Sequence, residues 1–226
     1  MVQVSTVILV HGAWANASAW AKVLPQLGAA GVTAVAAQLP LTTLPDDAAT
    51  LRRAIALAEG PVLLVGHSYG GSVITEAGTD PKVAGLVYVA AFAPGAGESA
   101  GGLGAGAPPT RILDVAIPDA QGFLKLTREG AADVFAHDIP AEEQALVYAT
   151  QGPLSVTALG GEVTSPAWRT KPSWYLRATE DRVIHPDLQD SMSKRIGATT
   201  IDVASSHVPM LSQPRAVTDF ILLAAR

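Results

Sequence analysis

The sequence predicts an α/β fold in which helices cover both faces of a mostly parallel sheet. Short runs made almost wholly of apolar residues, such as VILV at 7–10 and VLLV at 62–65, alternate with helical patterns. Strands that are apolar on both sides are buried on both faces, which is typical of a parallel sheet between helices. A chain of 226 residues that is 49% apolar can form one core, so we expect a single domain over 1–226.

The first part of the chain follows this alternation. Residues 5–12 are an apolar, β-branched run that ends at a glycine, and they predict a buried strand. A helix is expected over 18–31, because Ser18 is a suitable N-cap and a glycine stands at its end. Apolar runs then predict strands at 32–39, 61–66 and 82–93. Helices are predicted at 44–60, which has acids in its first turn, and from 69–78 onward.

The alternation breaks after residue 93. Residues 94–109 are rich in glycine and almost uncharged, and they predict a loop that we expect to move as a gate. Residues 110–165 carry short helical patterns, including 122–135 and 141–150, without strong strands, so we predict a small lid inserted at about 94–165. The alternation then resumes with a strand at 171–179, a helix at 186–197, a strand at 199–204 and a closing helix at 213–226.

The composition excludes several kinds of partner and chemistry. The formal net charge is −5, without a cluster of Lys or Arg, so we expect no nucleic-acid partner. The chain has no cysteine, which rules out disulfides and thiol nucleophiles. Residues 1–10 lack a basic region and the apolar run 83–93 is too short to span a bilayer, so we expect a cytoplasmic protein without membrane insertion. Neither HExxH nor a phosphate-binding loop motif occurs, and we expect no metal ion or cofactor.

Residues 66–70, GHSYG, match the G-x-S-x-G pattern of a nucleophile elbow. The match stands between a predicted strand and a predicted helix, which is the context that the motif requires. The glycines permit a bend so sharp that Ser68 can be lifted above the carboxyl edge of the sheet, at the N-terminus of the next helix. There the helix dipole favours a developing negative charge. The pattern therefore predicts Ser68 as a nucleophile.

A serine nucleophile needs a base, and the base needs an acid to orient it. With an elbow of this kind the three residues follow in the order serine, acid, histidine. His207 follows the last predicted strand and comes last of the five histidines, so it is the predicted base. The others lie beside turns at the sheet edge, in the lid or in the loop after 171–179: His11, His67, His137 and His185.

The acid should come from the loop after the preceding strand. The segment TEDRV offers Glu180 and Asp181, and we favour Asp181 because its shorter side chain is the commoner acid in such triads. Asp202 is a weaker candidate, because it lies inside the last strand and close to His207.

Two backbone amides are expected to hold the negative oxygen of the reaction intermediate. One belongs to Tyr69, the residue after the nucleophile, and the other to the loop after the first strand. In that loop, HGAWANAS, small residues allow the backbone to approach a substrate, so we assign Ala13, with Trp14 as the neighbouring possibility. His11 is expected to form hydrogen bonds beneath this loop.

The segments VILVHGAW, GHSYGG, ATEDRVIHP and SSHVPMLSQP resemble the α/β-hydrolases grouped with plant methylesterases and hydroxynitrile lyases. The resemblance covers nearly the whole chain and is weakest over 94–165. It implies the α/β-hydrolase fold, with Ser68 as nucleophile, Asp181 as acid, His207 as base, and Ala13 and Tyr69 as backbone donors.

The lyase branch of this group differs from the sequence at two positions. It has a threonine in place of Gly12 and a lysine directly after the catalytic histidine, where this chain has Val208. The resemblance implies that the charge of that lysine serves the cyanide leaving group. Its absence favours ester hydrolysis.

We therefore expect a serine hydrolase that cleaves a small carboxylic ester through an acyl-enzyme on Ser68. Apolar side chains predict an apolar substrate pocket, although those of the lid could equally attach it to the body: Trp14, Phe123, Leu124, Phe135, Leu146 and Leu154. Carbon–carbon cleavage, cyanohydrin lysis and lactone opening remain alternatives at the same site, as does a ligand sensor with slow turnover. Homodimers are frequent among such folds, so a homodimer also remains open.

Overall fold

The computed structural model describes residues 4–226. Residues 1–3, which belong to the predicted domain 1–226 and to the start region 1–10, lie outside the described residues. Six parallel strands form one sheet in the order β2-β1-β3-β4-β8-β9, which confirms the predicted α/β fold. The strands are β1 (Thr6–Val10), β2 (Thr33–Ala37), β3 (Val62–His67), β4 (Val83–Val89), β8 (Ser173–Ala178) and β9 (Thr199–Val203).

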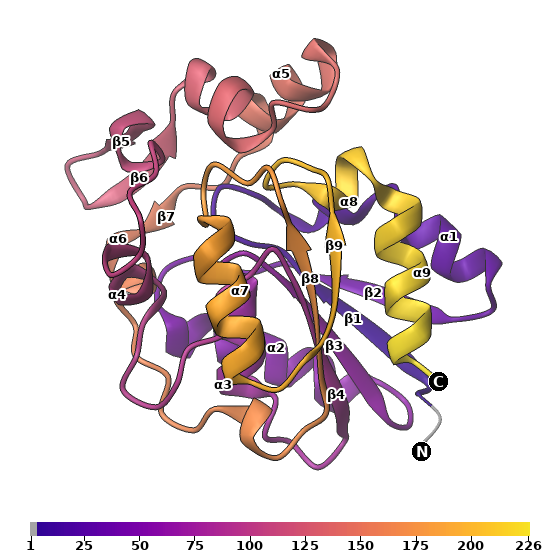
Figure 1. Ribbon diagram of the computed structural model, residues 1–226. Coiled ribbons are helices and arrows are strands. Elements are labelled where there is room, and N and C mark those ends of the chain that lie inside the picture. Colours follow the sequence, from indigo (N-terminus) through magenta and orange to yellow (C-terminus); the bar gives the residue numbers. More distant parts are fainter. Residues whose placement is uncertain (1–3) are drawn as a thin grey trace.

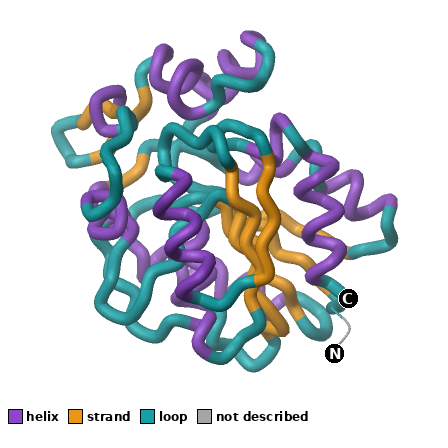
Figure 2. The backbone as a smooth tube through the Cα atoms, in the orientation of Figure 1, coloured by secondary structure: helices purple, strands orange, loops and turns teal. Residues whose placement is uncertain are grey.

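Helices cover both faces of this sheet, as Figures 1 and 2 show. On one face lie α1 (Leu24–Ala29) and α9 (Pro214–Ala224), and on the other lie α2 (Leu44–Leu57), α3 (Gly70–Ala77) and α7 (Pro186–Arg195). The helix predicted over 18–31 is divided into η1 (Ala17–Trp20) and α1, and Asn16, rather than Ser18, caps η1 through its side chain. Two further short helices are η4 (Ala167–Arg169) and α8 (Pro209–Ser212).

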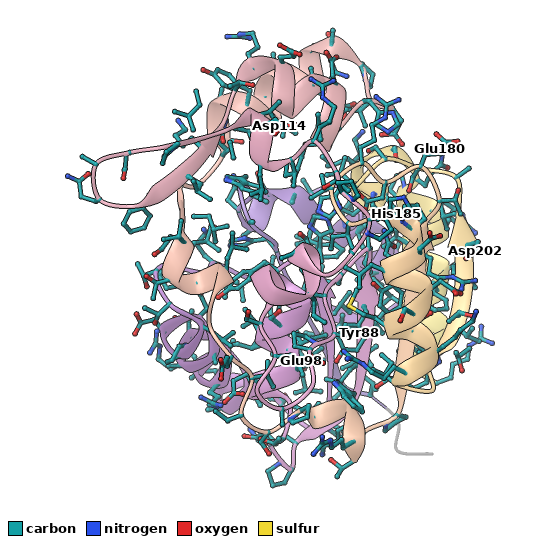
Figure 3. The ribbon with its side chains drawn as sticks, turned by 60° about the vertical axis from the view of Figure 1, so that its left-hand side comes forward. Tyr88, Glu98, Asp114, Glu180, His185 and Asp202 are labelled. Carbon is teal, nitrogen blue, oxygen red and sulfur yellow. The ribbon has the colours of Figure 1, made fainter. Side chains whose placement is uncertain are left out.

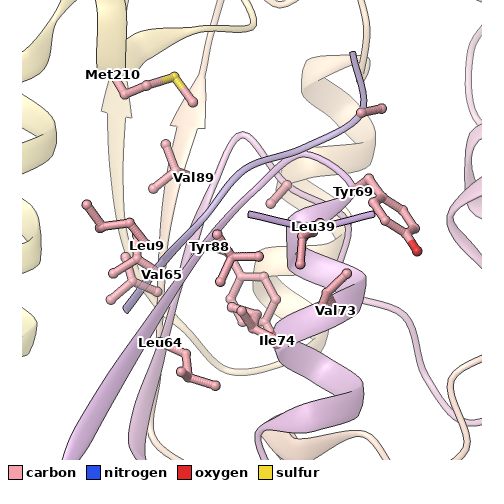
Figure 4. Packing of buried hydrophobic residues seen from close by; sticks show 14 of the residues in the cluster. Leu9, Leu39, Leu64, Val65, Tyr69, Val73, Ile74, Tyr88, Val89 and Met210 are labelled. Atoms are coloured by element: carbon pink, nitrogen blue, oxygen red, sulfur yellow. The ribbon is translucent and has the colours of Figure 1, made fainter. Parts of the chain in front are cut away.

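The core lies between the sheet and these helices. Strands β1 and β3 are buried along their whole length, because each is flanked by other strands and covered on both faces. The edge strands β2 and β9 are only partly buried. Figure 4 shows the side chains around β3 and α3 packed together, among them Leu9, Val65, Tyr88 and Ile74. The fully buried strands fix the position at which β3 ends and the elbow begins.

The segment between β4 and β8 contains the predicted lid. Most of its elements lie beyond the carboxyl ends of the strands, at the top of Figure 1. Its strands form a small antiparallel sheet in the order β5-β6-β7. Its elements are α4 (Ala100–Ala105), η2 (Leu113–Val115), β5 (Ala116–Pro118), β6 (Phe123–Leu126), η3 (Gly130–Phe135), α5 (Ala141–Thr150), β7 (Leu154–Ser155) and α6 (Val156–Leu159).

Two predictions for this segment are corrected. The helical pattern over 122–135 begins with strand β6, in which Leu124 and Leu126 are buried and Lys125 between them is exposed. That alternation has the two-residue period of a strand. It was missed because the segment 122–135 also contains the helical turns of η3. The loop predicted over 94–109 contains helix α4, whose N-cap Ser99 accepts a hydrogen bond from the Gly102 amide.

The helices of residues 4–226 all fall short of the length and apolarity that a membrane crossing requires.

Candidate active site

Ser68 stands on a strained bend between β3 and α3. Its φ is +53°, in the left-handed region that residues other than glycine seldom occupy. The flanking glycines allow the close approach that this bend demands, since a Cβ on Gly66 would lie 2.6 Å from the Gly70 carbonyl oxygen. The sharp turn leaves Ser68 at the carboxyl end of β3, on the wall of a cavity.

Asp181 and His207 come from two neighbouring loops and form a buried pair. Asp181 follows β8 and His207 follows β9, and His207 Nδ1 donates a 2.7 Å hydrogen bond to Asp181 Oδ2. Because the carboxylate can only accept, the proton of the neutral ring lies on Nδ1 and the lone pair on Nε2. His207 Nε2 is buried and has no partner within residues 4–226. The ring is therefore held in the tautomer that can accept a proton.

Lid residues pack against this histidine. The Phe135 ring meets the His207 ring edge to face, with centroids 5.1 Å apart. Asp138, just beyond η3, accepts a 2.8 Å hydrogen bond from the Ser206 amide, directly before His207. The lid thus supports the loop that carries the histidine, a role that the sequence did not indicate.

Four hydrogen bonds hold the Asp181 carboxylate. Oδ1 accepts from the amides of Val183 (2.7 Å) and Ile184 (3.0 Å). Oδ2 accepts from Gln189 Nε2 (2.8 Å) as well as from His207. These bonds fix the orientation of the carboxylate.

Gln189, on α7, is completely buried, and sequence reasoning missed it. Its Oε1 accepts from the Ala178 amide (3.0 Å), and since that amide can only donate, Nε2 must face Asp181. Nε2 also donates to the Ile184 carbonyl oxygen (2.9 Å). A glutamine eight residues after an aspartate carries no recognisable signal, so only the packing of α7 on β8 shows its role.

The two rival acids do not reach His207. Glu180 and Asp202 are both exposed, and Figure 3 places them at the outer surface. Asp202 accepts a 2.6 Å hydrogen bond from Arg177 Nε. The hydrogen bonds at Glu180 involve its backbone, which accepts from His137 Nε2 (3.0 Å) and donates to Ser205 (3.2 Å).

Ala13 and Tyr69 line the same cavity as Ser68. Both residues are buried, and neither amide donates a hydrogen bond to another group of residues 4–226. Buried N–H groups without a partner are rare because each costs free energy, so a pair of them beside a cavity indicates a place for an incoming oxygen atom. A Cβ on Gly12 would lie 2.5 Å from the Ser68 Cβ, so the threonine of the lyase branch does not fit this backbone.

His11 forms hydrogen bonds beneath this loop, as predicted. Its Nε2 accepts from the Leu39 amide (3.0 Å), so its proton lies on Nδ1, which donates to the Gly12 carbonyl oxygen (2.9 Å). The Gly12 carbonyl and the Ala13 N–H belong to one planar peptide unit. His11 therefore sets the orientation of the Ala13 amide.

The neutral state of His11 makes stability depend on pH. Burial lowers the pKa of His11 from 6.5 to about 4, so the unfolded chain binds this proton at a higher pH than the folded one. The contribution of neutral His11 to the free energy of unfolding is complete above pH 6.5. Up to roughly 3 kcal/mol of this free energy is lost as the pH falls towards 4. We expect the free energies of unfolding of the wild type and His11→Asn, measured in denaturant, to converge over this range. Parallel curves would contradict the assignment.

Tyr69 is anchored at its other end by Asp47, on α2. Its hydroxyl donates a 2.7 Å hydrogen bond to Asp47 Oδ2, while Oδ1 accepts from the Leu41 amide (2.8 Å). Burial raises the pKa of Tyr69 above its usual range, so the phenol remains a donor. Asp47 is a second supporting residue that sequence reasoning missed, because it appeared only as an acid in the first turn of a helix.

His67 cannot compete with His207 as the base. Its Nε2 donates a 2.7 Å hydrogen bond to the His207 carbonyl oxygen. Burial, followed by the nearby His207, holds the pKa of His67 well below its usual value. His67 therefore stays neutral and ties the elbow to the loop of the predicted base.

The cavity at Ser68 has a volume of about 300 Å³. The small residues of α4 form much of one wall, and a Cβ on Gly104 would meet nothing nearer than the Phe92 ring at 4.0 Å. The rest of the lining is mainly apolar and includes Ile112, Leu159, Val183 and Leu188.

The residues predicted to line one substrate pocket lie in different places in the structure. Trp14 lines the cavity at Ser68, but Phe135 and Leu146 line a second cavity of about 290 Å³, which Trp14 also borders. Phe123 and Leu154 line neither of these cavities, since both lie on the small lid sheet. The prediction is corrected for these four residues. Phe135 and Leu154 are buried in the core, whereas Phe123 is partly exposed and Leu146 is 61% exposed.

Comparisons with known proteins show the family of this chain. The model of the alpha/beta hydrolase family matches residues 7–220. A pyrethroid hydrolase of Sphingobium wenxiniae is 28% identical over 96% of this chain and 86% of its own length. The rice (Oryza sativa subsp. japonica) esterase PIR7B is 28% identical over 96% of this chain and 94% of its own length.

Solved structures have the same fold. The pyrethroid hydrolase of Sphingobium faniae JZ-2 superposes with a TM-score of 0.86 at 25% identity, covering 98% of this chain and 97% of that one. Polyneuridine aldehyde esterase superposes with a TM-score of 0.85 at 22% identity, covering 99% of this chain and all of that one, and this likeness concerns the fold.

Proposed function

This chain belongs to the alpha/beta hydrolase family, and from that premise we propose that it hydrolyses small, apolar carboxylic esters through an acyl-enzyme on Ser68. The observation that carries the proposal is the buried Asp181–His207 pair, in which a 2.7 Å hydrogen bond at Nδ1 leaves His207 Nε2 free. In this family the nucleophile stands on an elbow like that of Ser68. The names of the relatives, a pyrethroid hydrolase and an esterase, agree with carboxylesterase activity.

In the first half of the reaction, Ser68 Oγ attacks the ester carbonyl carbon while His207 Nε2 takes its proton. The carbonyl oxygen becomes negative and is stabilised by the amides of Ala13 and Tyr69. Donors placed in advance at this position cost no reorganisation when the charge develops. Asp181 stabilises the imidazolium and keeps Nδ1 protonated.

In the second half, His207 gives its proton to the leaving alcohol, and the acyl group remains on Ser68. Water then enters, and His207 Nε2 takes one of its protons as the oxygen attacks the acyl carbon. His207 returns this proton to Ser68 Oγ as the acyl–oxygen bond breaks, which releases the carboxylic acid and restores Ser68. Protein groups and water carry every step.

Two residues favour hydrolysis over cyanohydrin lysis. Gly12 leaves no room for the lyase threonine beside Ser68. Val208 places a buried apolar side chain where that branch has its lysine. A cyanide-release assay tests this choice, and we expect no cyanide from cyanohydrins.

Several expectations from the sequence remain predictions. They are the cytoplasmic location, the homodimer, the gate movement of 94–109, and the independence from nucleic acid, metal ions and cofactors. Lactone opening and slow ligand sensing likewise stay open as alternatives.

The proposal is tested by trapping the nucleophile. The wild type should release a burst of one p-nitrophenolate per chain from a p-nitrophenyl ester whenever deacylation is slow. A fluorophosphonate should abolish turnover, and mass spectrometry should find one adduct, on the peptide that contains Ser68. An adduct on another residue, or full activity after labelling, would overturn the proposal.

A further inference from the structure

The cavity at Ser68 is short of free polar groups. Three of its polar side chains already donate to the protein: Trp14 Nε1 to the Leu124 carbonyl (3.0 Å), Tyr69 to Asp47 (2.7 Å) and Thr110 to the Val183 carbonyl (3.2 Å). Among residues 4–226, no Lys, Arg, Asp or Glu lines this cavity. A charged substrate would be buried there without a partner, which is costly, so the ester is neutral.

Apart from Ser68, His185 is the one polar side chain of residues 4–226 lining this cavity whose donor is still free. It lies at the start of α7, below the lid, as Figure 3 shows. Its Nδ1 accepts a 3.2 Å hydrogen bond from the Asp187 amide and so caps α7. Because that amide can only donate, the neutral ring carries its proton on Nε2. Within residues 4–226, Nε2 has no hydrogen-bond partner, and the side chain is 34% exposed.

We propose that His185 determines specificity by donating from Nε2 to a neutral acceptor on the substrate, such as an ether or carbonyl oxygen remote from the scissile bond. The inference rests on the proposed function and narrows its substrate class to neutral, apolar esters with one such acceptor. An unpaired donor in an apolar cavity costs free energy. A substrate that accepts its hydrogen bond is therefore favoured over a hydrocarbon analogue that cannot.

Three variants separate this role from helix capping. His185→Gln keeps a donor near the position of Nε2 but loses the cap, His185→Asn keeps an acceptor for the Asp187 amide but not the reach, and His185→Leu loses both. If His185 binds substrate, the glutamine variant retains the preference and the asparagine variant loses it. If His185 only caps α7, asparagine preserves wild-type behaviour.

The substrates are two isosteric series. One is p-nitrophenyl heptanoate with each methylene from C4 to C6 replaced in turn by oxygen, and the other is acetate esters of matched alkanols and alkoxyalkanols. For at least one ether we expect kcat/KM to exceed that of its hydrocarbon analogue about five- to tenfold in the wild type and in His185→Gln. We expect a ratio near one in the other two variants.

The outcomes distinguish this inference from the proposed function. Hydrolysis of the hydrocarbon esters that does not depend on Ser68 would refute the function itself. Hydrolysis that depends on Ser68, but with no ether preference in either series, or with a preference that survives in His185→Asn or His185→Leu, would refute the role of His185 alone. Circular dichroism of each variant checks that it is folded.

Discussion

Replacing Ser68 by alanine should reduce the turnover of p-nitrophenyl esters about a million-fold, to the background of the assay. Without Oγ no acyl-enzyme can form, and His207 and the two amides are left to assist water alone. KM should change little, because the cavity walls remain intact. The measurement is steady-state hydrolysis by wild type and variant, purified in parallel.

Ser72, in the first turn of α3, provides a matched control. Ser72 is buried and its hydroxyl has no hydrogen-bond partner within residues 4–226, so Ser72→Ala removes an atom that does no bonding. We expect it to keep wild-type turnover. If activity survived Ser68→Ala, the elbow would not carry the nucleophile, whereas loss in both variants would point to a damaged α3.

Asp181→Asn should reduce kcat by about four orders of magnitude. The amides of Val183 and Ile184 both donate to one oxygen of Asp181, so the asparagine must present its carbonyl to them. Its NH₂ group then faces His207 Nδ1, where a proton has to be accepted rather than donated. The ring is driven into the other tautomer, with its proton on Nε2, and can no longer accept the proton of Ser68.

Glu180→Gln is the control for this experiment. It removes the neighbouring charge, which is exposed, and should leave kcat unchanged. A large loss in Glu180→Gln, with kcat retained in Asp181→Asn, would return the choice of acid to Glu180.

The sheet was predictable because buried parallel strands need continuous apolar runs, and β1, β3 and β4 each read as one. The strands within the predicted lid were not predictable, because they are only two to four residues long and stand directly beside helical turns. Short elements of this kind form through tertiary contacts, such as the bond from Trp14 to the Leu124 carbonyl, which no local pattern reveals.

The positions of Ser68, Asp181 and His207 were predictable because each follows a strand, and parallel strands bring their carboxyl ends to one edge. The residues that support them were not. Gln189 reaches Asp181, and Asp47 reaches Tyr69, through one hydrogen bond each, and helix packing places both side chains. A polar residue on a helix ordinarily faces solvent. The substrate pocket was placed on the wrong part of the insertion, since β6 and β7 hold the lid together while α4 faces Ser68.

The insertion between β4 and β8 thus contains two parts with different roles: one part contacts the loop of His207, and the other, helix α4, lines the cavity. Phe135 and Asp138 pack on or bind the loop of His207, whereas none of the hydrogen bonds made by Asp181 or His207 within residues 4–226 involves α4. Evolution, or a mutant library, can therefore change the substrate range through α4, starting at the open space above Gly104, without touching the chemistry. A transplanted lid from a relative would have to bring its own matching histidine loop.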